Sequence, residues 1–244
     1  MRFRLLTYNV HGCRGVDRQV SPWRIAEVIA ATGADVAALQ EVDFNRKRSA
    51  RQDQAEVIAA QLSMDFHYHP AWELAREQLG DAVLSRLPMR LMHAGALPSS
   101  SRWKRERRGA LWVRVETTGR QVNLLNTHLA LNGRDRLAQT ETLFGPDWLG
   151  HPQCRPPLVL CGDFNARPGS RVHRRVVQKL RDVHTGPKVR RRRRTFPTRY
   201  PVASLDHVFL SREFEVRHVE VVRTPLTRLA SDHYPLLVEL SLPS

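Results

Sequence analysis

The sequence predicts an α/β fold in which sheets and helices pack in layers, and three observations lead to this prediction. Residues 3–42 have the pattern of an apolar strand, a capped helix and a second apolar strand, which is the building unit of α/β folds. Further strand-like apolar runs recur toward the C-terminus, separated by stretches with helical spacing. Polar side chains stand at the ends of these runs, where ligands gather in α/β sheets.

The N-terminal unit has clear boundaries. The first strand, Phe3–Asn9, ends at Asn9 and a glycine turn. A helix is predicted to begin with Ser21 as its N-cap and Pro22 as its first residue, and to end at Gly33. The second strand begins at Asp35, and Glu41 lies near its carboxyl end. A glutamate at this position is either an exposed strand terminus or a ligand for a hard cation.

The middle of the chain alternates between the same patterns. His128 closes the second strand of a predicted β-hairpin, whose turn is Thr117–Gly119. The elements predicted here are a helix over 53–64, a strand over 80–88, hairpin strands over 110–116 and 121–129, and a helix over 134–144.

The stretch Leu158–Pro168 combines a buried-strand pattern with two polar residues. Asp163 and Asn165 are two residues apart, so an extended backbone places them on one face. A carboxylate can orient or deprotonate water, and an amide can donate to a charged oxygen. The alternative interpretation is an ordinary turn, since Asp and Asn are common turn residues.

The last third contributes a predicted helix and two strands. Val172, Val176, Leu180 and Val183 predict one apolar helical face. Asp206 interrupts the apolar run of a strand over 203–211, and the polar residues of 231–235 lead into a final strand. Asp232 and His233 would face opposite ways in a strand, but the following proline favours an extended or turning backbone that could offer both to one cleft.

Length and composition favour a single domain over residues 1–244, because no linker, low-complexity block or repeat divides the 244 residues. There is no signal-peptide pattern and no long apolar span. Three unpatterned cysteines suggest neither a disulfide framework nor a zinc site. We therefore expect a cytoplasmic protein with no transmembrane segment, most simply a monomer.

The formal net charge of +15 points to polyanionic partners. Only four lysines are present, so nearly all of the positive charge is arginine, whose fork matches phosphate oxygens. The segment 102–108 mixes cations with a tryptophan, and Arg190–Arg194 is an unbroken basic run. Arginine enrichment can also reflect coding bias and solvated surface, but the clustering favours a polyanion.

Polar residues at strand ends together suggest a metal site. They are rich in oxygen ligands and poor in sulfur, which favours Mg²⁺ or Mn²⁺, and their two histidines can supply acid–base or phosphate-binding groups. The residues are Asn9, Glu41, Asp81, His128, Asp163, Asn165, Asp206, Asp232 and His233.

Seven short motifs occur in an order that resembles the endonuclease/exonuclease/phosphatase superfamily, which includes deoxyribonuclease I and inositol-polyphosphate 5-phosphatases. They span the chain from the first strand to the last. The resemblance implies a four-layer α/β/β/α sandwich with a metal site where the two sheets open. The motifs are Thr7–Gly12, Leu39–Val42, Leu84–Pro88, Asn126–Leu129, Gly162–Asn165, Leu205–Phe209 and Ser231–Pro235.

The resemblance also implies roles for individual residues. Glu41 would be the principal metal carboxylate, assisted by Asn9 and Asp232, and the ion would be Mg²⁺ or Mn²⁺. The remaining roles would be catalytic: His233, oriented by Asp206, acts on the attacking water or the phosphate, Asp163 is the competing general base, Asn165 holds a phosphate oxygen, and His128 contacts the scissile phosphate or protonates the leaving group.

Two features separate this chain from many relatives. Asp81 stands where they carry an asparagine, and an added carboxylate repels phosphate unless it helps to hold metal or pairs with an arginine. His128 resembles the deoxyribonuclease, sphingomyelinase and phosphatase branches, whereas the exonuclease III branch has a tyrosine there. Repair of abasic sites is therefore disfavoured.

The expected activity is metal-dependent hydrolysis of phosphodiester bonds, with DNA or RNA as the substrate. The alternative is a phosphatase or phospholipid phosphodiesterase acting on an anionic phospholipid or a phosphorylated small molecule. A third hypothesis is a non-catalytic nucleic-acid-binding protein, against which the intact set of polar motifs argues.

Overall fold

The structure is a computed structural model that describes residues 2–100, 107–185 and 193–242. Its first sheet is mixed, with β1 parallel to β2 and the other pairs antiparallel. The strands are β1 (Arg2–Asn9), β2 (Val36–Phe44), β3 (Asp65–Leu74), β4 (Glu77–Ser85), β11 (Glu215–Val221) and β12 (Leu236–Ser241), in the order β11–β12–β1–β2–β4–β3.

The second sheet faces the first. Its parallel pair is β7 and β8, and its other pairs are antiparallel. The strands are β5 (Met89–Leu97), β6 (Arg108–Thr117), β7 (Arg120–His128), β8 (Leu158–Asp163), β9 (Arg181–Asp182) and β10 (Asp206–Leu210), in the order β5–β6–β7–β8–β10–β9.

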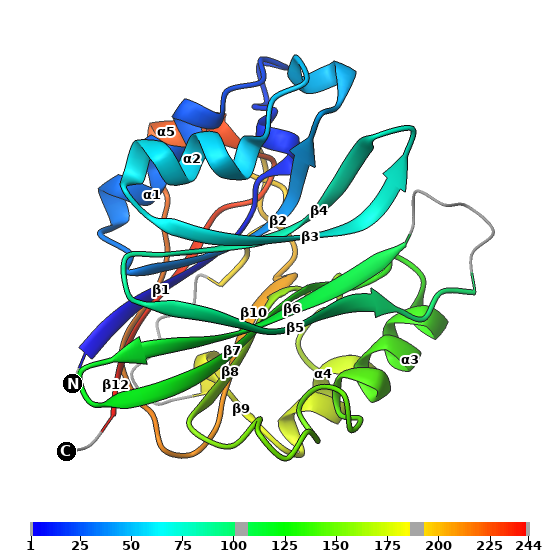
Figure 1. Cartoon of the computed structure of the whole chain (residues 1–244), viewed down its shortest axis with the longest axis vertical. Helices are drawn as coiled ribbons and strands as arrows, with labels where there is room; N and C mark the ends of the chain where they lie inside the picture. The colour runs from blue at the N-terminus through cyan, green and yellow to red at the C-terminus, as the bar shows by residue number, and fades with distance from the viewer. Residues whose placement is uncertain (1, 101–106, 186–192, 243–244) are drawn as a thin grey trace.

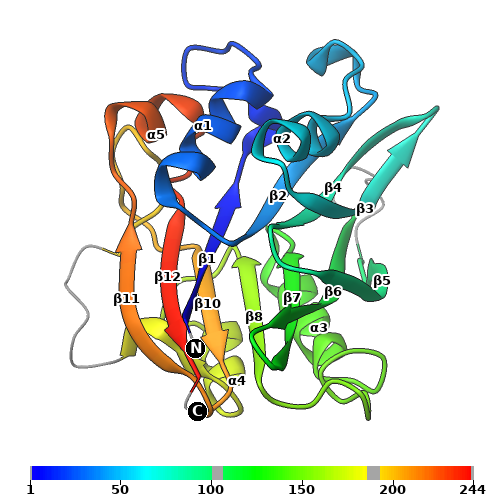
Figure 2. The ribbon, with the colours of Figure 1, turned by 60° about the vertical axis from the view of Figure 1, so that its left-hand side comes forward.

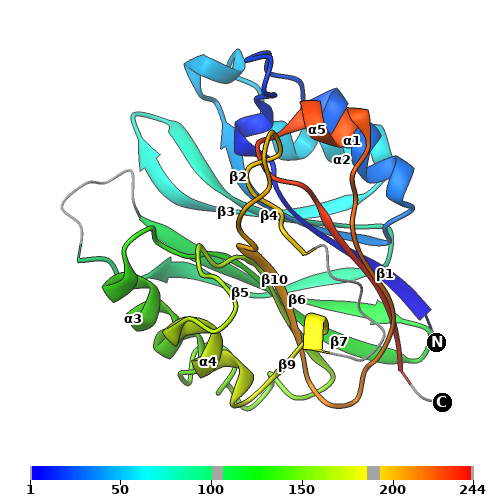
Figure 3. The same ribbon diagram turned by 180° about the vertical axis from the view of Figure 1, so that it is seen from behind.

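Helices cover both outer faces of this pair of sheets (Figure 1). The first sheet carries α1 (Pro22–Thr32), α2 (Gln54–Leu62) and α5 (Pro225–Ala230), and the second carries α3 (Gly133–Leu143) and α4 (Arg171–Val177). Short 3₁₀ turns lie at His11–Cys13, Lys47–Ser49 and Val183–Thr185. Figures 2 and 3 show the same four layers from the side and from behind. The predicted α/β/β/α sandwich is confirmed.

Three apolar cores separate the four layers. Leu5, Val113 and Val238 belong to the core between the sheets, where both faces of the buried strands are apolar. Ile25 and Ile58 pack between the first sheet and its helices, and a third cluster lies beneath α3 and α4. The strands that carry the polar site residues are thus fixed on both faces.

Several predicted boundaries are confirmed by their capping contacts. Ser21 Oγ accepts a hydrogen bond from the Arg24 amide at 3.2 Å, and α1 ends at Gly33, which has φ +62°. Asp53 caps α2 through a 3.1 Å bond from the Glu56 amide. The β6–β7 hairpin turns at the predicted place.

The predicted helix through Val183 is too long. The structure ends α4 at Val177, so Leu180 and Val183 lie outside it. Both side chains are buried nonetheless, because the chain turns into β9 and then into a 3₁₀ turn. The four apolar residues at helical spacing thus lie in α4, in the turn that follows it and in the 3₁₀ turn.

The sequence did not predict three strands that lie at sheet edges. β3, β5 and β11 have half-exposed side chains with frequent polar residues, so their apolar alternation is weak. The short helix α5 was also missed. Asp206, which was expected to interrupt a strand, instead begins β10.

Neither basic segment falls wholly within the described residues. Of 102–108 the structure describes only Arg107 and Arg108, and of Arg190–Arg194 only Arg193 and Arg194. Among the described residues, no helix combines the length and apolar character that a membrane span requires.

Candidate active site

The candidate site lies at the edge where strand ends of the first sheet come close to strand ends of the second sheet. Asn9 is the last residue of β1, and His128 and Asp163 are the last residues of β7 and β8. β7 is parallel to β8 with His128 opposite Asp163, and antiparallel β10 brings Asp206 opposite Asp163. Strand register therefore gathers these side chains at one edge.

Asn9 connects the two sheets. Its side-chain Nδ2 donates to Glu41 Oε1 at 3.1 Å and to Asp163 Oδ2 at 3.0 Å. Its Oδ1 accepts from the His11 amide at 3.0 Å. Asn9 of the first sheet is thus hydrogen-bonded both to Glu41 on its own sheet and to Asp163 on the second sheet.

A β-bulge directs Glu41 into this edge. Leu39 pairs with Ala82 and Val42 with Gly80, so two residues of β2 oppose Asp81 alone. Glu41 takes φ +57° within the bulge and keeps its side chain 26 % exposed. Bulges redirect side chains beside functional sites, and this one gives Glu41 an accessible carboxylate.

A glycine allows β7 and β8 to approach each other closely at the site. Gly162 has φ +138°, and a Cβ there would lie 1.8 Å from the Thr127 carbonyl oxygen. No residue with a side chain fits this backbone. His128 Nε2 consequently lies 3.6 Å from Asp163 Oδ2.

Asn165 is held beside His128 by a tight turn. The backbone amide of Asn165 donates to Asp163 Oδ1 at 2.8 Å, and its backbone has φ +46°. Its Nδ2 contacts the Leu129 carbonyl at 2.9 Å and His128 Nε2 at 3.0 Å. With Nδ2 as the donor, His128 accepts at Nε2 and carries its proton on Nδ1. Burial, Arg108 and His233 lower the pKa of His128 well below its ordinary value, which agrees with a neutral ring.

His233 faces the same carboxylate from the other side. Its Nδ1 lies 2.9 Å from Asp206 Oδ2, and its Nε2 lies 3.7 Å from Asp163 Oδ2. Burial favours the neutral ring, but the charges of Asp206 and Asp163 prevail and raise the pKa of His233 to about 10. With this pKa the ring of His233 carries a proton on both nitrogens near neutral pH.

Asp232 lies beside His11 at the rim of the site. Its Oδ1 lies 3.7 Å from His11 Nδ1, and its side chain is 36 % exposed. Because the His11 amide also donates to Asn9 Oδ1, His11 connects Asp232 to the cluster around Asn9.

Two buried carboxyls have raised pKa values. Burial raises the pKa of Asp81 to about 8, with Glu41 and Asp163 adding to the effect and Arg108 opposing it. Burial also raises the pKa of Asp163 to about 7, against the influence of His233. Asp81 Oδ2 is buried without a hydrogen-bond partner in the described structure. A site this rich in carboxylate oxygen suits a hard divalent cation.

Three neighbours of the site were not among the predicted site residues. Ser231 Oγ donates to the Asn9 carbonyl at 2.8 Å and accepts from the His233 amide at 3.2 Å, which fixes the loop before β12. Arg108 is buried and donates to the Leu129 carbonyl at 3.3 Å. His11 and Ser231 lie within the quoted motifs, whereas no sequence signal showed that Arg108 turns inward.

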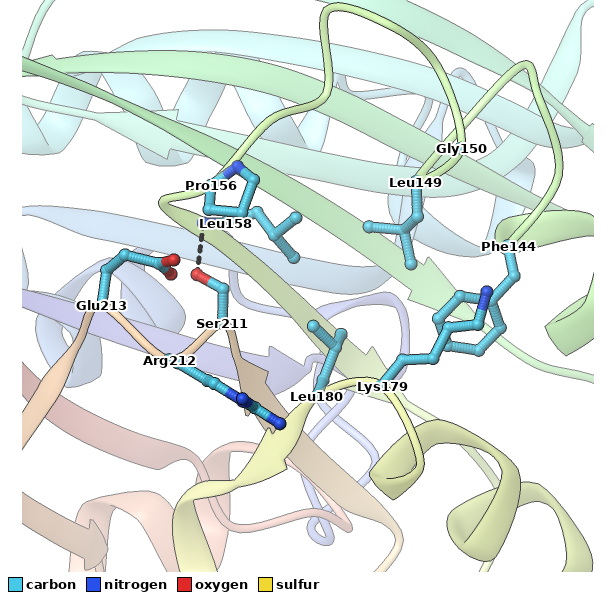
Figure 4. A pocket seen from close by; sticks show the side chains of 10 residues that line it. All are labelled: Phe144, Leu149, Gly150, Pro156, Leu158, Lys179, Leu180, Ser211, Arg212 and Glu213. Carbon is cyan, nitrogen blue, oxygen red and sulfur yellow. Dashed lines mark hydrogen bonds between the residues drawn. The ribbon is translucent and has the colours of Figure 1, made fainter.

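A separate pocket of about 360 Å³ lies at the opposite end of β8 (Figure 4). Leu158, Leu180 and Phe144 give it an apolar lining, and the Leu158 amide donates to Ser211 Oγ at 3.0 Å on one side of it. Leu158 and Asp163 are five positions apart along β8, roughly 16 Å at 3.3 Å per residue. The pocket is therefore distinct from the carboxylate site.

The family model described as "Endonuclease/Exonuclease/phosphatase family" matches residues 6–233. The match includes every predicted site residue, from Asn9 to His233. The chain belongs to this family.

Similar proteins agree with this assignment. YbhP of Escherichia coli K12, an uncharacterized protein, is 27 % identical over 251 residues, which cover 98 % of this chain and 96 % of YbhP. A mannosyl-6-phosphatase of Bacteroides thetaiotaomicron superimposes with a TM-score of 0.78 at 20 % identity, covering 98 % of this chain and all of that one. The human Nocturnin catalytic domain with bound sulfate gives 0.75 at 22 % identity, covering 99 % and 95 %. The two structures establish the shared fold.

Proposed function

We propose that the chain is a divalent-metal-dependent phosphodiesterase that hydrolyses DNA or RNA. The observation that carries the proposal is the single linked cluster at the sheet edge. Asn9 bonds both Glu41 and Asp163, and two histidines flank Asp163 at 3.6 and 3.7 Å. The family provides phosphoester hydrolysis as the reaction class.

Glu41, Asn9 and Asp232 are the residues proposed to hold Mg²⁺ or Mn²⁺. All three offer oxygen, the donor atom that both ions prefer, and the Glu41 and Asp232 side chains are accessible. Asp81 Oδ2 adds a buried carboxylate oxygen that lacks a hydrogen bond. A bound ion would neutralise charge on the phosphate and its leaving group.

Asp163 is the proposed general base. Its Oδ1 accepts from the Asn165 amide and its Oδ2 from Asn9, so the carboxylate is fixed at the centre of the cluster. His233 presents Nε2 to the same space, and the 2.9 Å contact with Asp206 fixes its ring. In this arrangement Asp163 takes a proton from water, and His233 donates to a phosphate oxygen.

His128 and Asn165 are the proposed phosphate-binding pair on the second sheet. Their side chains are 3.0 Å apart, and the Leu129 carbonyl holds the Asn165 amide. The Nδ1–H of His128, which lies 3.9 Å from Glu41 Oε1, would donate to a phosphate oxygen beside the proposed metal ligand. Asn165 Nδ2 would donate to another phosphate oxygen by exchanging its bond to the Leu129 carbonyl or to His128 Nε2 for one to the phosphate. Donors held in place before the reaction stabilise the additional charge of the transition state.

Exposed arginines in the loops after the site-bearing strands, and at the start of helix α3 after β7, support an extended polyanion as the substrate. We call them the mouth arginines. Because β1 and β2 are parallel, as are β7 and β8, the loops after these strands lie at the edge that carries the site. The mouth arginines are Arg14 and Arg18 after β1, Arg51 after β2, Arg134 after β7 and Arg167 after β8.

The second candidate is a phosphatase or a phospholipid phosphodiesterase. The observation that favours it is the fit of a mannosyl-6-phosphatase over nearly the whole chain, since that protein builds a sugar phosphatase on the same fold. Both candidates use the same cluster, and they differ in what the mouth arginines contact.

A substrate panel with Mg²⁺ and Mn²⁺ tests the proposal. We expect cleavage of single- or double-stranded DNA or RNA by the purified chain, and its loss in Glu41→Ala. If nucleic acids stay intact while a sugar phosphate or phospholipid is hydrolysed, the second candidate replaces the first. Binding of DNA without hydrolysis of any substrate with either metal would indicate a non-catalytic binding protein.

A further inference from the structure

A second cluster of metal-ligating side chains joins α4 to the edge of the second sheet. His173 belongs to α4, Asp182 to β9 and His207 to β10. One ligand atom of each lies within 4.8 Å of the others. None of the three takes part in the proposed phosphodiesterase chemistry.

His207 Nδ1 is the atom that this cluster leaves unexplained. Its Nε2 donates to the Ala166 carbonyl at 2.8 Å, so Nδ1 carries a lone pair. Nδ1 is buried, has no hydrogen-bond partner in the described structure, and lies 4.0 Å from Asp182 Oδ2. The lone pair of His207 Nδ1 and the carboxylate of Asp182 repel each other unless a cation lies between them.

The charge states agree with this picture. Burial lowers the pKa of His207, so the ring is neutral despite its carboxylate neighbour. Burial opposes ionisation of Asp182, but contacts with His184, His207 and His173 hold the pKa of that carboxyl below its usual range. A neutral imidazole and an ionised carboxylate are the forms that bind metal.

We propose that His173 Nε2, Asp182 and His207 Nδ1 form a second metal site, selective for a borderline transition ion such as Zn²⁺. Two imidazoles and one carboxylate are a zinc-type donor set, unlike the oxygen-rich set around Glu41.

The distances fit a tetrahedral ion after a small adjustment. With metal–ligand bonds near 2.0–2.1 Å, tetrahedral ligand atoms lie about 3.3 Å apart. The structure has 2.9 Å between His173 Nε2 and Asp182 Oδ2, and 4.0 Å between His207 Nδ1 and the same oxygen. The fourth position would go to solvent or to His184, whose Nδ1 lies 3.3 Å from Asp182 Oδ1.

The surroundings supply the second shell that metal sites need. The bond from His207 to the Ala166 carbonyl fixes the tautomer that leaves Nδ1 available. Phe209 stacks on the His207 ring at 5.3 Å, and Phe164 packs edge-on against it, so this side of the site is apolar.

Metal binding requires one change of hydrogen bonding. His173 Nδ1 now accepts from the Gly169 amide at 3.2 Å, and its Nε2–H donates to Asp182. Coordination through Nε2 moves that proton to Nδ1, so the Gly169 amide must turn to solvent. Gly169 is exposed, with nothing within 4 Å of the position of a Cβ, so its amide can reach solvent if the peptide turns.

Metal content in a Glu41→Ala background tests the site independently of catalysis, because that background removes the principal ligand of the proposed active-site ion. We expect about one Zn²⁺ per chain after gel filtration, measured by elemental mass spectrometry. Co²⁺ in place of Zn²⁺ should give the visible d–d absorption of a tetrahedral site with nitrogen ligands. Absence of tightly bound Zn²⁺ and of this absorption would overturn the proposal.

His173→Gln is the informative second substitution. Its amide can keep the hydrogen bond to Asp182, yet it is a poor ligand for Zn²⁺. We expect Zn²⁺ affinity to fall more than about 100-fold, since even loss of an outer-shell partner costs 10–100-fold. His218→Gln, which alters an exposed histidine on β11, should retain the ion. Equal Zn²⁺ content in both variants would show adventitious binding and contradict the proposal.

Discussion

Asp163 is the residue on which most contacts of the site converge. Its two carboxylate oxygens accept from Asn165 and Asn9, and the rings of His128 and His233 flank it. Burial raises its pKa to about 7. A carboxylate this closely surrounded cannot move without disturbing its neighbours, so its position is fixed before substrate arrives.

Replacing a proposed acid–base residue should abolish most turnover and leave the fold intact. For His233→Ala and Asp163→Asn we expect kcat to fall by about 10²–10⁴, the usual contribution of a positioned acid or base. Hydrolysis assays with saturating Mg²⁺, read beside the circular dichroism spectrum, provide the measurement. Exposed His218→Ala is the control, and near-normal turnover in either site variant would remove that residue from the chemistry.

The close approach at Gly162 predicts a stability effect. Gly162→Ala places a Cβ where the Thr127 carbonyl now lies, at φ +138°. We expect the free energy of unfolding to drop by at least about 1–3 kcal/mol, because the backbone conformation alone costs this much and the contact with the Thr127 carbonyl adds to it. Gly119→Ala in the β6–β7 turn is the matched control, because it has φ +77° with open space around it. Equal urea midpoints for the two variants would refute the prediction.

At the scale of elements, the site depends on departures from regular strands. The bulge in β2 turns Glu41 toward the edge, and the turn after β8 folds Asn165 back onto His128. Regular strands would have placed Glu41 and Gln40 on opposite faces of the sheet. These irregularities cost backbone energy and place ligands that a plain strand cannot.

Helix α3 carries an element-scale prediction about pH. Hydrogen bonds from Ser100 chiefly, and from Asn132 and Ser99, lower the pKa of Asp135 to about 2, whereas burial opposes this. The unfolded carboxyl has a pKa near 3.9, so its folded value is depressed. The stabilisation is therefore complete above about pH 4 and is lost as the pH falls toward 2.

Asp135→Asn measures this contribution. We expect the variant to be less stable at pH 7 by about 1.5–3 kcal/mol, the range for hydrogen bonds to a charged group. The difference from wild type should shrink as urea unfolding is repeated at progressively lower pH. A difference that stays constant down to about pH 2 would mean that ionisation of Asp135 does not stabilise the fold.

At the scale of the whole molecule, the packing of the two sheets creates the site. Asn9 lies 154 residues before Asp163, and Ser231 lies 222 residues after Asn9, yet both pairs are hydrogen-bonded. The inner core of Leu5, Val113 and Val238 fixes the sheets against each other. Loss of this packing would separate the proposed metal ligands from the acid–base residues.

Charge at the mouth of the site predicts a salt effect. Replacing Arg134 and Arg167 with glutamine should weaken nucleic-acid binding and reduce the slope of log K against log salt by about 0.9 per lost phosphate contact on duplex DNA. Arg120→Gln is the control, since Arg120 is exposed at the opposite end of β7. An unchanged slope in the double variant would indicate that the mouth arginines do not contact the backbone of the substrate.

The sequence by itself determined the layered α/β class, the strands that end in polar residues, and the caps of α1 and α2. These features are local: a period of two, a serine before a proline and a glycine after a helix act within a few residues. The ordered motifs also indicated the family, which the match over residues 6–233 shows. The edge strands β5 and β11 were not predicted, because half-exposed strands need little alternation of apolar and polar residues.

Only the tertiary structure decided which polar residues meet. It joined Asn9 to Asp163, turned Arg108 inward, left Asp232 at the rim, and assembled His173, Asp182 and His207 from three elements. The physical reason is that register, the bulge and sheet packing act between residues far apart in the chain. Distances between such residues follow from the packed core, and no local pattern encodes them.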